Sequence, residues 1–136
     1  MIKKIQVTKL KTFKNINGNI FQGLKRNEVS YKRFGEIYFT YINYNKIKAW
    51  KYHSKMTLNL MVPLGEVRFV FIDKDHQILK LDVSKKNYIR ITVPPKIWFG
   101  FKGLARNTSL VVNLSNIMHD EKEVQNFSLD YFDYKW

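Results

Sequence analysis

The chain has 136 residues, of which 45% are hydrophobic and 15% aromatic, so its composition suits one folded domain and excludes a disordered segment. It contains no cysteine, which excludes disulfides, thiolate metal sites and a cysteine nucleophile. Its net charge of +13, from 24 Lys and Arg against 11 Asp and Glu, favours an anionic partner. Because the lysines are spread along the whole chain, the sequence argues against a dedicated nucleic-acid patch.

Nothing in the sequence predicts association with a membrane. No apolar run is long enough to span a bilayer, and the first residues lack the apolar stretch of a signal peptide. We therefore expect a single domain over residues 1–136, located in the cytoplasm, with neither a membrane nor a nucleic-acid partner.

The amino-terminal third of the chain predicts only short strands. An edge strand carrying charged residues is expected within Ile2–Leu10, a turn at Asn17-Gly18, and a short strand over Ile20–Leu24. From Gly35 onward the residue pattern is consistently that of β-strands. The strands expected there contain Ile37–Tyr41, Ile47–His53, Met56–Pro63, Glu66–Asp73, Ile78–Val83, Tyr88–Val93, Ile97–Phe101 and Leu110–Ser115.

Three connections stand out between these strands. Pro63-Leu64-Gly65 predicts a compact hairpin, and Pro94-Pro95 should end a strand because proline has no backbone N–H to donate. His119–Val124 is the one segment with a helical pattern, since acidic residues cluster near its start. Many short strands with little helix predict an all-β sandwich or barrel, and a jelly roll would enclose a ligand between its sheets.

The strand that ends near residue 53 carries the most suggestive polar side chains. Strand side chains alternate between faces, so Lys51, His53 and Lys55 are expected to point the same way. One imidazole between two ammonium groups can hold an anion and move a proton. On the preceding strand, Glu36 is expected to form a cross-strand ion pair with Lys48 or Lys51.

Two stretches of the chain resemble a known family. The runs IKAWKYHSKMTLNLMVPLGEVRFVFID and NYIRITVPPKIWFGFKGL look like the dTDP-sugar isomerase branch of the cupins, over roughly Gly18 to Asp130. That branch contains the dTDP-4-dehydrorhamnose 3,5-epimerases and the dTDP-4-keto-6-deoxyhexose 3,4-ketoisomerases. The resemblance implies a cupin-type jelly roll (a double-stranded β-helix) of two packed antiparallel sheets. It further implies a homodimer that binds a dTDP-linked sugar inside the barrel without a metal or other cofactor.

At the family's functional positions this chain keeps some residue types and replaces others. Lys48 stands where the family has an arginine that contacts the diphosphate, and Lys51 stands where the epimerases have their catalytic histidine. His53 matches the second histidine of the ketoisomerases, and Lys51 replaces their first. Phe99 replaces the histidine of the VPP strand, and Met118 replaces the catalytic tyrosine of the epimerases.

Chemistry next to a ketone needs a base for the α-proton, a cation or donor for the enolate oxygen, and an acid on the opposite face. His53 is the candidate base, and Lys51 with Lys55 would lower its pKa and stabilise the enolate. The acid is Tyr38, Tyr41 or His119, with Tyr38 taken as the first candidate. The candidate substrate-binding residues are Lys48, Lys55, Asn59, Arg68 and Trp98, and no metal ligand set is expected because the three histidines are far apart in sequence.

Several functions stay open at this point. The first is 3,5-epimerisation of a dTDP-4-keto sugar, and 3,4-ketoisomerisation is its alternative. A third is a catalytically silent module that binds the sugar nucleotide, and a fourth is a basic β-barrel that binds nucleic acid. A homodimer is also expected, because the basic amino-terminal edge strand and the aromatic tail over residues 131–136 would need to be covered.

Overall fold

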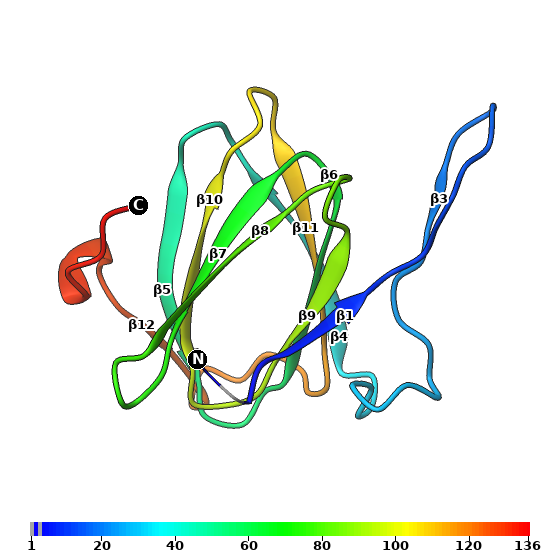
Figure 1. The fold of residues 1–136 in the computed structure, drawn as a ribbon. Coiled ribbons are helices and arrows are strands. Elements are labelled where there is room, and N and C mark those ends of the chain that lie inside the picture. The colour runs from blue at the N-terminus through cyan, green and yellow to red at the C-terminus, as the bar shows by residue number, and fades with distance from the viewer. Residues whose placement is uncertain (1, 3) are drawn as a thin grey trace.

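The computed structural model describes Ile2 and residues 4–136, and strands dominate it (Figure 1). In chain order the strands are β1 (Gln6–Lys9), β2 (Thr12–Phe13), β3 (Ile20–Phe21), β4 (Glu36–Ile42), β5 (Ile47–His53), β6 (Leu58–Leu64), β7 (Val67–Ile72), β8 (Ile78–Val83), β9 (Ile89–Val93), β10 (Trp98–Gly103), β11 (Ser109–Ser115) and β12 (Val124–Asn126). A 3₁₀ turn, η1 (Leu129–Tyr131), follows them. No helix among the described residues is long and apolar enough to cross a membrane.

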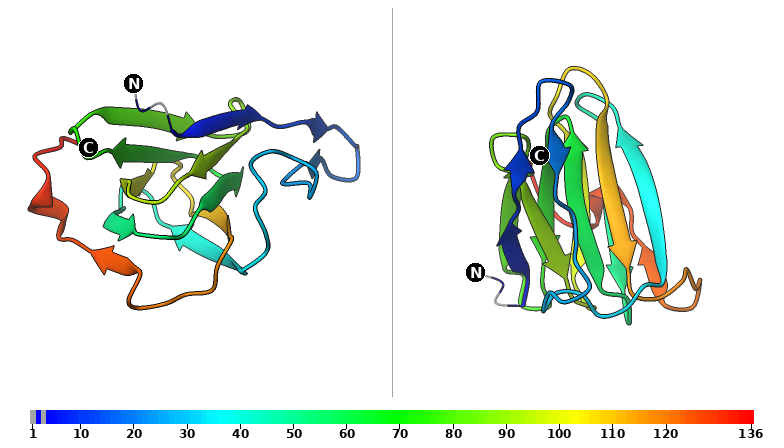
Figure 2. Two further views of the ribbon diagram at one scale, coloured as in Figure 1. Left: turned by 90° about the horizontal axis from the view of Figure 1, so that it is seen from below. Right: turned by 90° about the vertical axis from the view of Figure 1, so that its right-hand side faces the viewer.

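Two five-stranded antiparallel sheets face each other across the molecule (Figures 1 and 2). Sheet I has the strand order β1-β9-β6-β11-β4, and sheet II has the order β12-β5-β10-β7-β8. The small β2–β3 hairpin projects away from both sheets (Figure 1). This architecture confirms the predicted all-β jelly roll of two packed antiparallel sheets, with β1 as the edge strand that the amino-terminal sequence predicts.

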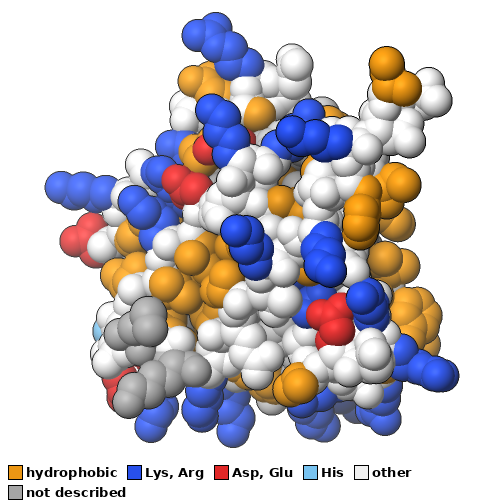
Figure 3. All heavy atoms as spheres, turned by 45° about the vertical axis from the view of Figure 1, so that its right-hand side comes forward, with side chains coloured by type: hydrophobic (Ala, Val, Ile, Leu, Met, Phe, Trp, Pro, Cys, Tyr) orange, Lys and Arg blue, Asp and Glu red, His pale blue; other side chains and the backbone are white. Residues whose placement is uncertain are grey.

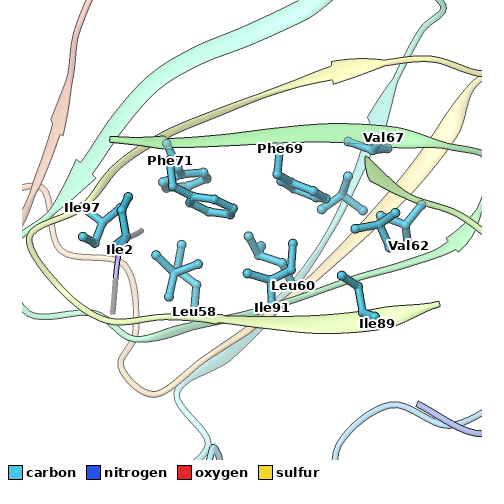
Figure 4. Packing of buried hydrophobic residues seen from close by; sticks show 14 of the residues in the cluster. Ile2, Leu58, Leu60, Val62, Val67, Phe69, Phe71, Ile89, Ile91 and Ile97 are labelled. Atoms are coloured by element: carbon cyan, nitrogen blue, oxygen red, sulfur yellow. The ribbon is translucent and has the colours of Figure 1, made fainter. Parts of the chain in front are cut away.

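The apolar side chains between the two sheets form the main core (Figure 4). Leu58 and Leu60 of β6 point toward Phe69 and Phe71 of β7, because alternate residues of each strand face the opposite sheet. Ile91 of β9 joins them and is fully buried. Apolar packing thus fills the space around β6, β7 and β9.

Two predictions of local structure are wrong, a hairpin and a helix. Pro63-Leu64-Gly65 does not close a hairpin, because β6 belongs to sheet I and β7 to sheet II, so the chain crosses between the sheets there. Gly65 allows the crossing, since its φ of 86° lies in the left-handed region and a Cβ would collide with Ser109. The segment His119–Val124 is not helical. It contains a turn and leads into the short strand β12, which pairs with β5.

The outer face of sheet II has its own apolar cover. Trp50 of β5 is 1% exposed and packs with Val70 and Ile72 beneath the carboxyl-terminal residues, which include Phe132 and Trp136. Its ring also donates a hydrogen bond from Nε1 to the backbone oxygen of Leu129. The aromatic tail thus packs onto the outer face of sheet II, with Phe132 and Trp136 partly buried there and Tyr131 52% exposed.

Candidate active site

A cavity of about 500 Å³ opens between the two sheets on the side of β4 and β5. A volume of this size matches the pockets that bind small molecules. Sheet I contributes Glu36 and Tyr38 of β4 to the lining, and sheet II contributes Lys48, Lys51 and His53 of β5. The cavity thus has one wall with acidic and phenolic groups and one wall with cations and an imidazole.

A β-bulge on β5 brings its three polar residues to the same wall. Lys51 pairs with Phe99 of β10, whereas Lys48 pairs with Phe101, so three steps along β5 match two steps along β10. In a regular strand Lys48 and Lys51 would lie on opposite faces, and the extra residue turns Lys48 back toward the interior. The Lys48 ammonium then donates a hydrogen bond to the backbone oxygen of Tyr41 at 2.8 Å, which links the two sheets.

Gly100 makes room for this bulge, and replacing it with alanine should destabilise the fold. A Cβ at residue 100 would lie 2.5 Å from the Cβ of Ala49, in the bulged part of β5. Overpacking of this kind costs about 1–3 kcal/mol, so we expect Gly100→Ala to lower the free energy of unfolding by that amount in urea denaturation. Gly23→Ala is the matched control, because its nearest contact would be the flexible Met61 sulfur at 3.4 Å. Equal stability of the two variants would contradict this role for Gly100.

A buried carboxylate holds the imidazole of His53. Nδ1 of His53 lies 2.5 Å from Oε1 of Glu123, and the two residues are only 8% and 2% exposed. Oε2 of Glu123 accepts hydrogen bonds from the backbone N–H groups of Lys55 and Met56, each at 3.2 Å. With Nδ1 donating to the carboxylate, Nε2 is the ring nitrogen left to accept a proton.

The protonation states of this pair follow from its surroundings. Burial lowers the pKa of His53, the bond to Glu123 offsets part of that lowering, and the charge of Lys51 adds to it. Burial opposes ionisation of Glu123, yet its bonds to His53 and to the backbone N–H groups bring its pKa below the ordinary value. The pair at neutral pH is therefore a neutral imidazole beside a carboxylate, which is the form that a general base needs.

We expect NMR titration to place the midpoint of His53 protonation below the ordinary histidine value of about 6.5. Protonation then favours the unfolded chain, so the free energy of unfolding should decrease as the pH falls from about 6.5 toward that midpoint. Lys51→Met is the informative companion variant, because removing the ammonium should raise the midpoint. A wild-type midpoint above 6.5 would contradict the burial argument.

The opposite wall of the cavity comes from β4 and β11 of sheet I. Tyr38 pairs directly with Asn113 of β11, and both side chains line the cavity. Partial desolvation and the neighbouring Glu36 carboxylate raise the pKa of Tyr38, so the phenol keeps its proton at neutral pH. Glu36 forms no ion pair with Lys48 or Lys51, contrary to expectation. Its Oε2 instead accepts the backbone N–H of His119 at 3.0 Å, and the two predicted strands lie in different sheets.

The structure brings part of the predicted site together. Tyr38, Lys48, Lys51 and His53 all line the cavity, as does His119, one of the alternative acids. The other alternative acid, Tyr41, is not among the lining residues. Met118, at the family's tyrosine position, is 72% exposed and does not line the cavity either.

Four predicted substrate-binding residues lie elsewhere. Lys55 follows the end of β5 and does not line the cavity, so it does not share the face of Lys51 and His53. Asn59 is buried and bonds to Ser30 and Thr92. Arg68 forms a bidentate ion pair with Asp82, in which Nε and Nη2 each donate a hydrogen bond of 2.8 Å to a carboxylate oxygen. Trp98 packs against Tyr52 and the tail in the outer cluster of sheet II.

Sequence reasoning missed Glu123, the residue that holds His53. Seventy positions separate the two residues, and Glu123 fell within the segment that was expected to be helical. No group of three or more histidine, aspartate or glutamate side chains is placed to bind a metal ion among the residues that the structure describes. The site consists of a carboxylate-held imidazole, two lysines and a phenol.

Comparison with solved structures gives a consistent group of relatives. A dTDP sugar isomerase from Desulfovibrio desulfuricans is 27% identical and superposes with a TM-score of 0.91, over 95% of this chain and 87% of that one. A dTDP-6-deoxy-D-glucose-3,5-epimerase from Legionella pneumophila, solved with dTDP-4-keto-L-rhamnose, is 15% identical with a TM-score of 0.81, over 94% and 74%. A sugar 3,4-ketoisomerase from Thermoanaerobacterium thermosaccharolyticum, solved with TDP, is 14% identical with a TM-score of 0.78, over 96% and 93%.

The last two comparisons establish the fold, and the first adds a likeness in sequence. No protein-family model matches the chain. No curated protein matches it either. Taken with the cavity between the sheets, the solved structures confirm that this chain resembles the dTDP-sugar isomerase branch of the cupins.

Proposed function

We propose that this protein is an epimerase or isomerase of a dTDP-linked 4-keto-6-deoxyhexose, which acts by enolisation next to the ketone. The observation that carries the proposal is the buried His53–Glu123 pair, whose imidazole lines the same cavity as Tyr38 of the facing sheet. The 27% identity to a dTDP sugar isomerase supports the class of substrate.

Each group has a distinct part in the proposed reaction. Nε2 of His53 removes the proton from the carbon beside the ketone, and Glu123 keeps the ring in the tautomer that can accept it. The Lys51 ammonium stabilises the negative charge that develops on the enolate oxygen. Tyr38, which stays protonated, can return a proton from the sheet I side of the cavity.

Two reactions share this enolate, and different features favour each. Protonation by Tyr38 on the face opposite His53 would invert the carbon, and the same step at the other carbon beside the ketone would complete a 3,5-epimerisation. A single held imidazole that takes a proton from C3 and returns it to C4, while the hydroxyl proton of O3 passes to O4, would give 3,4-ketoisomerisation. Lys51 replaces a histidine of both groups of enzymes and does not distinguish them, whereas Met118 at the position of the epimerase tyrosine favours this second candidate. NMR analysis of the product from a dTDP-4-keto-6-deoxyhexose distinguishes an epimer from a 3-keto sugar.

Lys48 is the proposed contact to the diphosphate. Its ammonium lines the cavity and bonds to the backbone of β4, so a cation is available to a ligand between the two sheets. Charge-assisted bonds to phosphate are worth about 1.5–3 kcal/mol, so Lys48→Ala should weaken dTDP binding by roughly tenfold or more in calorimetry. Lys86→Ala, at an exposed turn, is the matched control. Undiminished affinity of the Lys48 variant would place the diphosphate elsewhere.

On the face that Figure 3 shows, the distribution of charged side chains supports a small anionic ligand over nucleic acid. Figure 3 shows Lys and Arg side chains scattered over one face and its lower rim, with acidic side chains among them. A nucleic-acid site would present a continuous basic stripe with exposed aromatic rings. The proposed substrate needs only the few cations of the cavity.

We also propose a homodimer, in which the edge of sheet I is covered. β4 is the last strand of that sheet, and Ile37, Phe39 and Tyr41 are exposed along it. Unpaired edges with exposed aromatic side chains mark association surfaces. Light scattering should therefore give twice the chain mass of 16.3 kDa, and Phe39→Lys should shift the protein toward the monomer. A wild-type monomer at micromolar concentration would contradict this assembly.

A further inference from the structure

Glu123, which holds the imidazole, belongs to a segment that ends in the aromatic tail. We call residues 123–136 the strap, which contains β12, η1 and the tail over residues 131–136. β12 follows Glu123 directly and pairs with β5, where Val124 stands opposite His53. The rest of the strap lies outside sheet II (Figures 1 and 2). One short stretch of chain therefore reaches the base at its start and covers the sheet at its end.

Trp50 of β5 holds the strap with both its backbone and its side chain. Its backbone N–H donates to the oxygen of Phe127 at 3.0 Å, and the N–H of Phe127 donates back to the oxygen of Trp50 at 2.9 Å. The indole Nε1 donates to the backbone oxygen of Leu129 at 3.1 Å. Three rings of the tail pack around the indole, with centroids 5.3–6.3 Å away: Phe132, Tyr134 and Trp136. Trp50 thus fixes the strap on the same strand that carries His53.

β12 by itself is a weak attachment. It has three residues at the edge of sheet II, and both Gln125 and Asn126 are exposed. Segments with few buried apolar contacts open locally at little cost in free energy. Burial of the Glu123 carboxylate also favours opening, because opening would rehydrate its charge. The rings of the tail, partly buried over Trp50, supply apolar contacts that oppose it.

We infer that the aromatic tail is a latch for the base: its docking on Trp50 keeps the strap closed and thereby keeps Glu123 on Nδ1 of His53. None of residues 131–136 lines the cavity, so the tail acts through Glu123 and not through contact with a ligand. The effect of the latch on catalysis rests on the proposed function and deepens it, since release of the tail would free the imidazole to change its tautomer and switch the site off.

The latch is tested by shortening the tail and by a milder change within it. A chain that ends at Ser128 lacks all three rings, and Phe132→Ala removes one of the rings that contact Trp50. Lys135→Ala is the matched control, because this side chain belongs to the tail but is exposed.

Four measurements separate the latch from a general loss of stability. The NMR shifts of the ring nitrogens report the tautomer of His53, and hydrogen exchange of the Phe127 amide reports opening of the strap. Exchange of the amide of Ile91, fully buried in sheet I, reports the stability of the whole fold. Deuterium incorporation into a dTDP-4-keto-6-deoxyhexose reports activity.

In the shortened chain we expect the Phe127 amide to exchange roughly tenfold faster or more, with exchange at Ile91 unchanged. The ring nitrogens of His53 should lose their distinct signals, and deuterium incorporation should fall roughly tenfold, because only molecules with a closed strap are active. Phe132→Ala should accelerate exchange at Phe127 with a smaller loss of rate. Lys135→Ala should match the wild type.

Unchanged exchange at Phe127 and an unchanged tautomer of His53 in both variants would overturn the latch and leave the proposed function standing. If the shortened chain fails to fold, Phe132→Ala alone decides between these results. A wild type without deuterium incorporation, in which loss of the tail still releases the tautomer of His53, would overturn the proposed function and leave the hold of the tail on Glu123 standing.

Discussion

Replacing His53 with asparagine should stop proton exchange at the carbon beside the ketone while leaving dTDP affinity within about twofold of the wild type. The reason is that asparagine removes the proton acceptor but none of the proposed phosphate contacts. A positioned general base contributes roughly 10²–10⁴-fold to a rate, and we expect a loss within that range. The measurement is deuterium incorporation from heavy water, followed by NMR.

Persistence of wild-type exchange in the His53 variant would refute the catalytic assignment. Lys51→Met serves as the companion, because it removes the cation proposed to stabilise the enolate and leaves the base in place. Its rate should fall less than that of His53→Asn. If dTDP affinity also collapsed in the His53 variant, its effect would be structural, because His53 is buried and packs near Phe99.

The second large effect is expected for Glu123→Gln. If the amide oxygen of glutamine faces His53, its NH₂ group confronts the backbone N–H groups of Lys55 and Met56, and donors meet donors. If the NH₂ group faces His53, Nδ1 must become the acceptor, and the ring proton moves to Nε2. The first arrangement destabilises the fold, and the second removes the lone pair that the proposed reaction needs.

We therefore expect Glu123→Gln to lower the exchange rate by roughly 10²-fold or more, because a carboxylate that orients a catalytic imidazole has effects of that order. Glu121→Gln makes the same change two residues earlier at an exposed position, so its exchange rate and thermal stability should match the wild type. An active, fully stable Glu123 variant would show that the carboxylate does not set the tautomer of His53.

From β4 to β11 the sequence was sufficient to predict the strands, because their side chains alternate so regularly. Apolar residues fill nearly every position from Val67 to Ile72, and the structure places Phe69 and Phe71 in the main core and Val70 beneath the tail. The pairing of those strands was harder to predict. A short link such as Pro63-Leu64-Gly65 serves equally for a hairpin and for a crossing between sheets, and only the packing of the whole chain decides between them.

In the candidate site, too, residues that depend on the pattern of one strand could be predicted, and residues that depend on long-range pairing could not. His53 and Lys51 could be found because they alternate on one strand, whereas Lys48 reaches the same wall only through a bulge that alternation does not predict. Glu123 is brought to His53 by the pairing of β12 with β5, which depends on contacts seventy residues apart in sequence. Arg68 was a reasonable phosphate ligand until its partner Asp82 on the adjacent strand was known.

The central claim is that His53 enolises a nucleotide-linked keto sugar inside the cavity between the sheets. The most direct measurement is to incubate the wild-type protein with a dTDP-4-keto-6-deoxyhexose in heavy water and to follow each carbon-bound proton by NMR. We predict that deuterium appears at the carbon next to the ketone at a rate proportional to the protein concentration. Tight binding of dTDP without any exchange would contradict the claim and identify the protein as a catalytically silent sugar-nucleotide module.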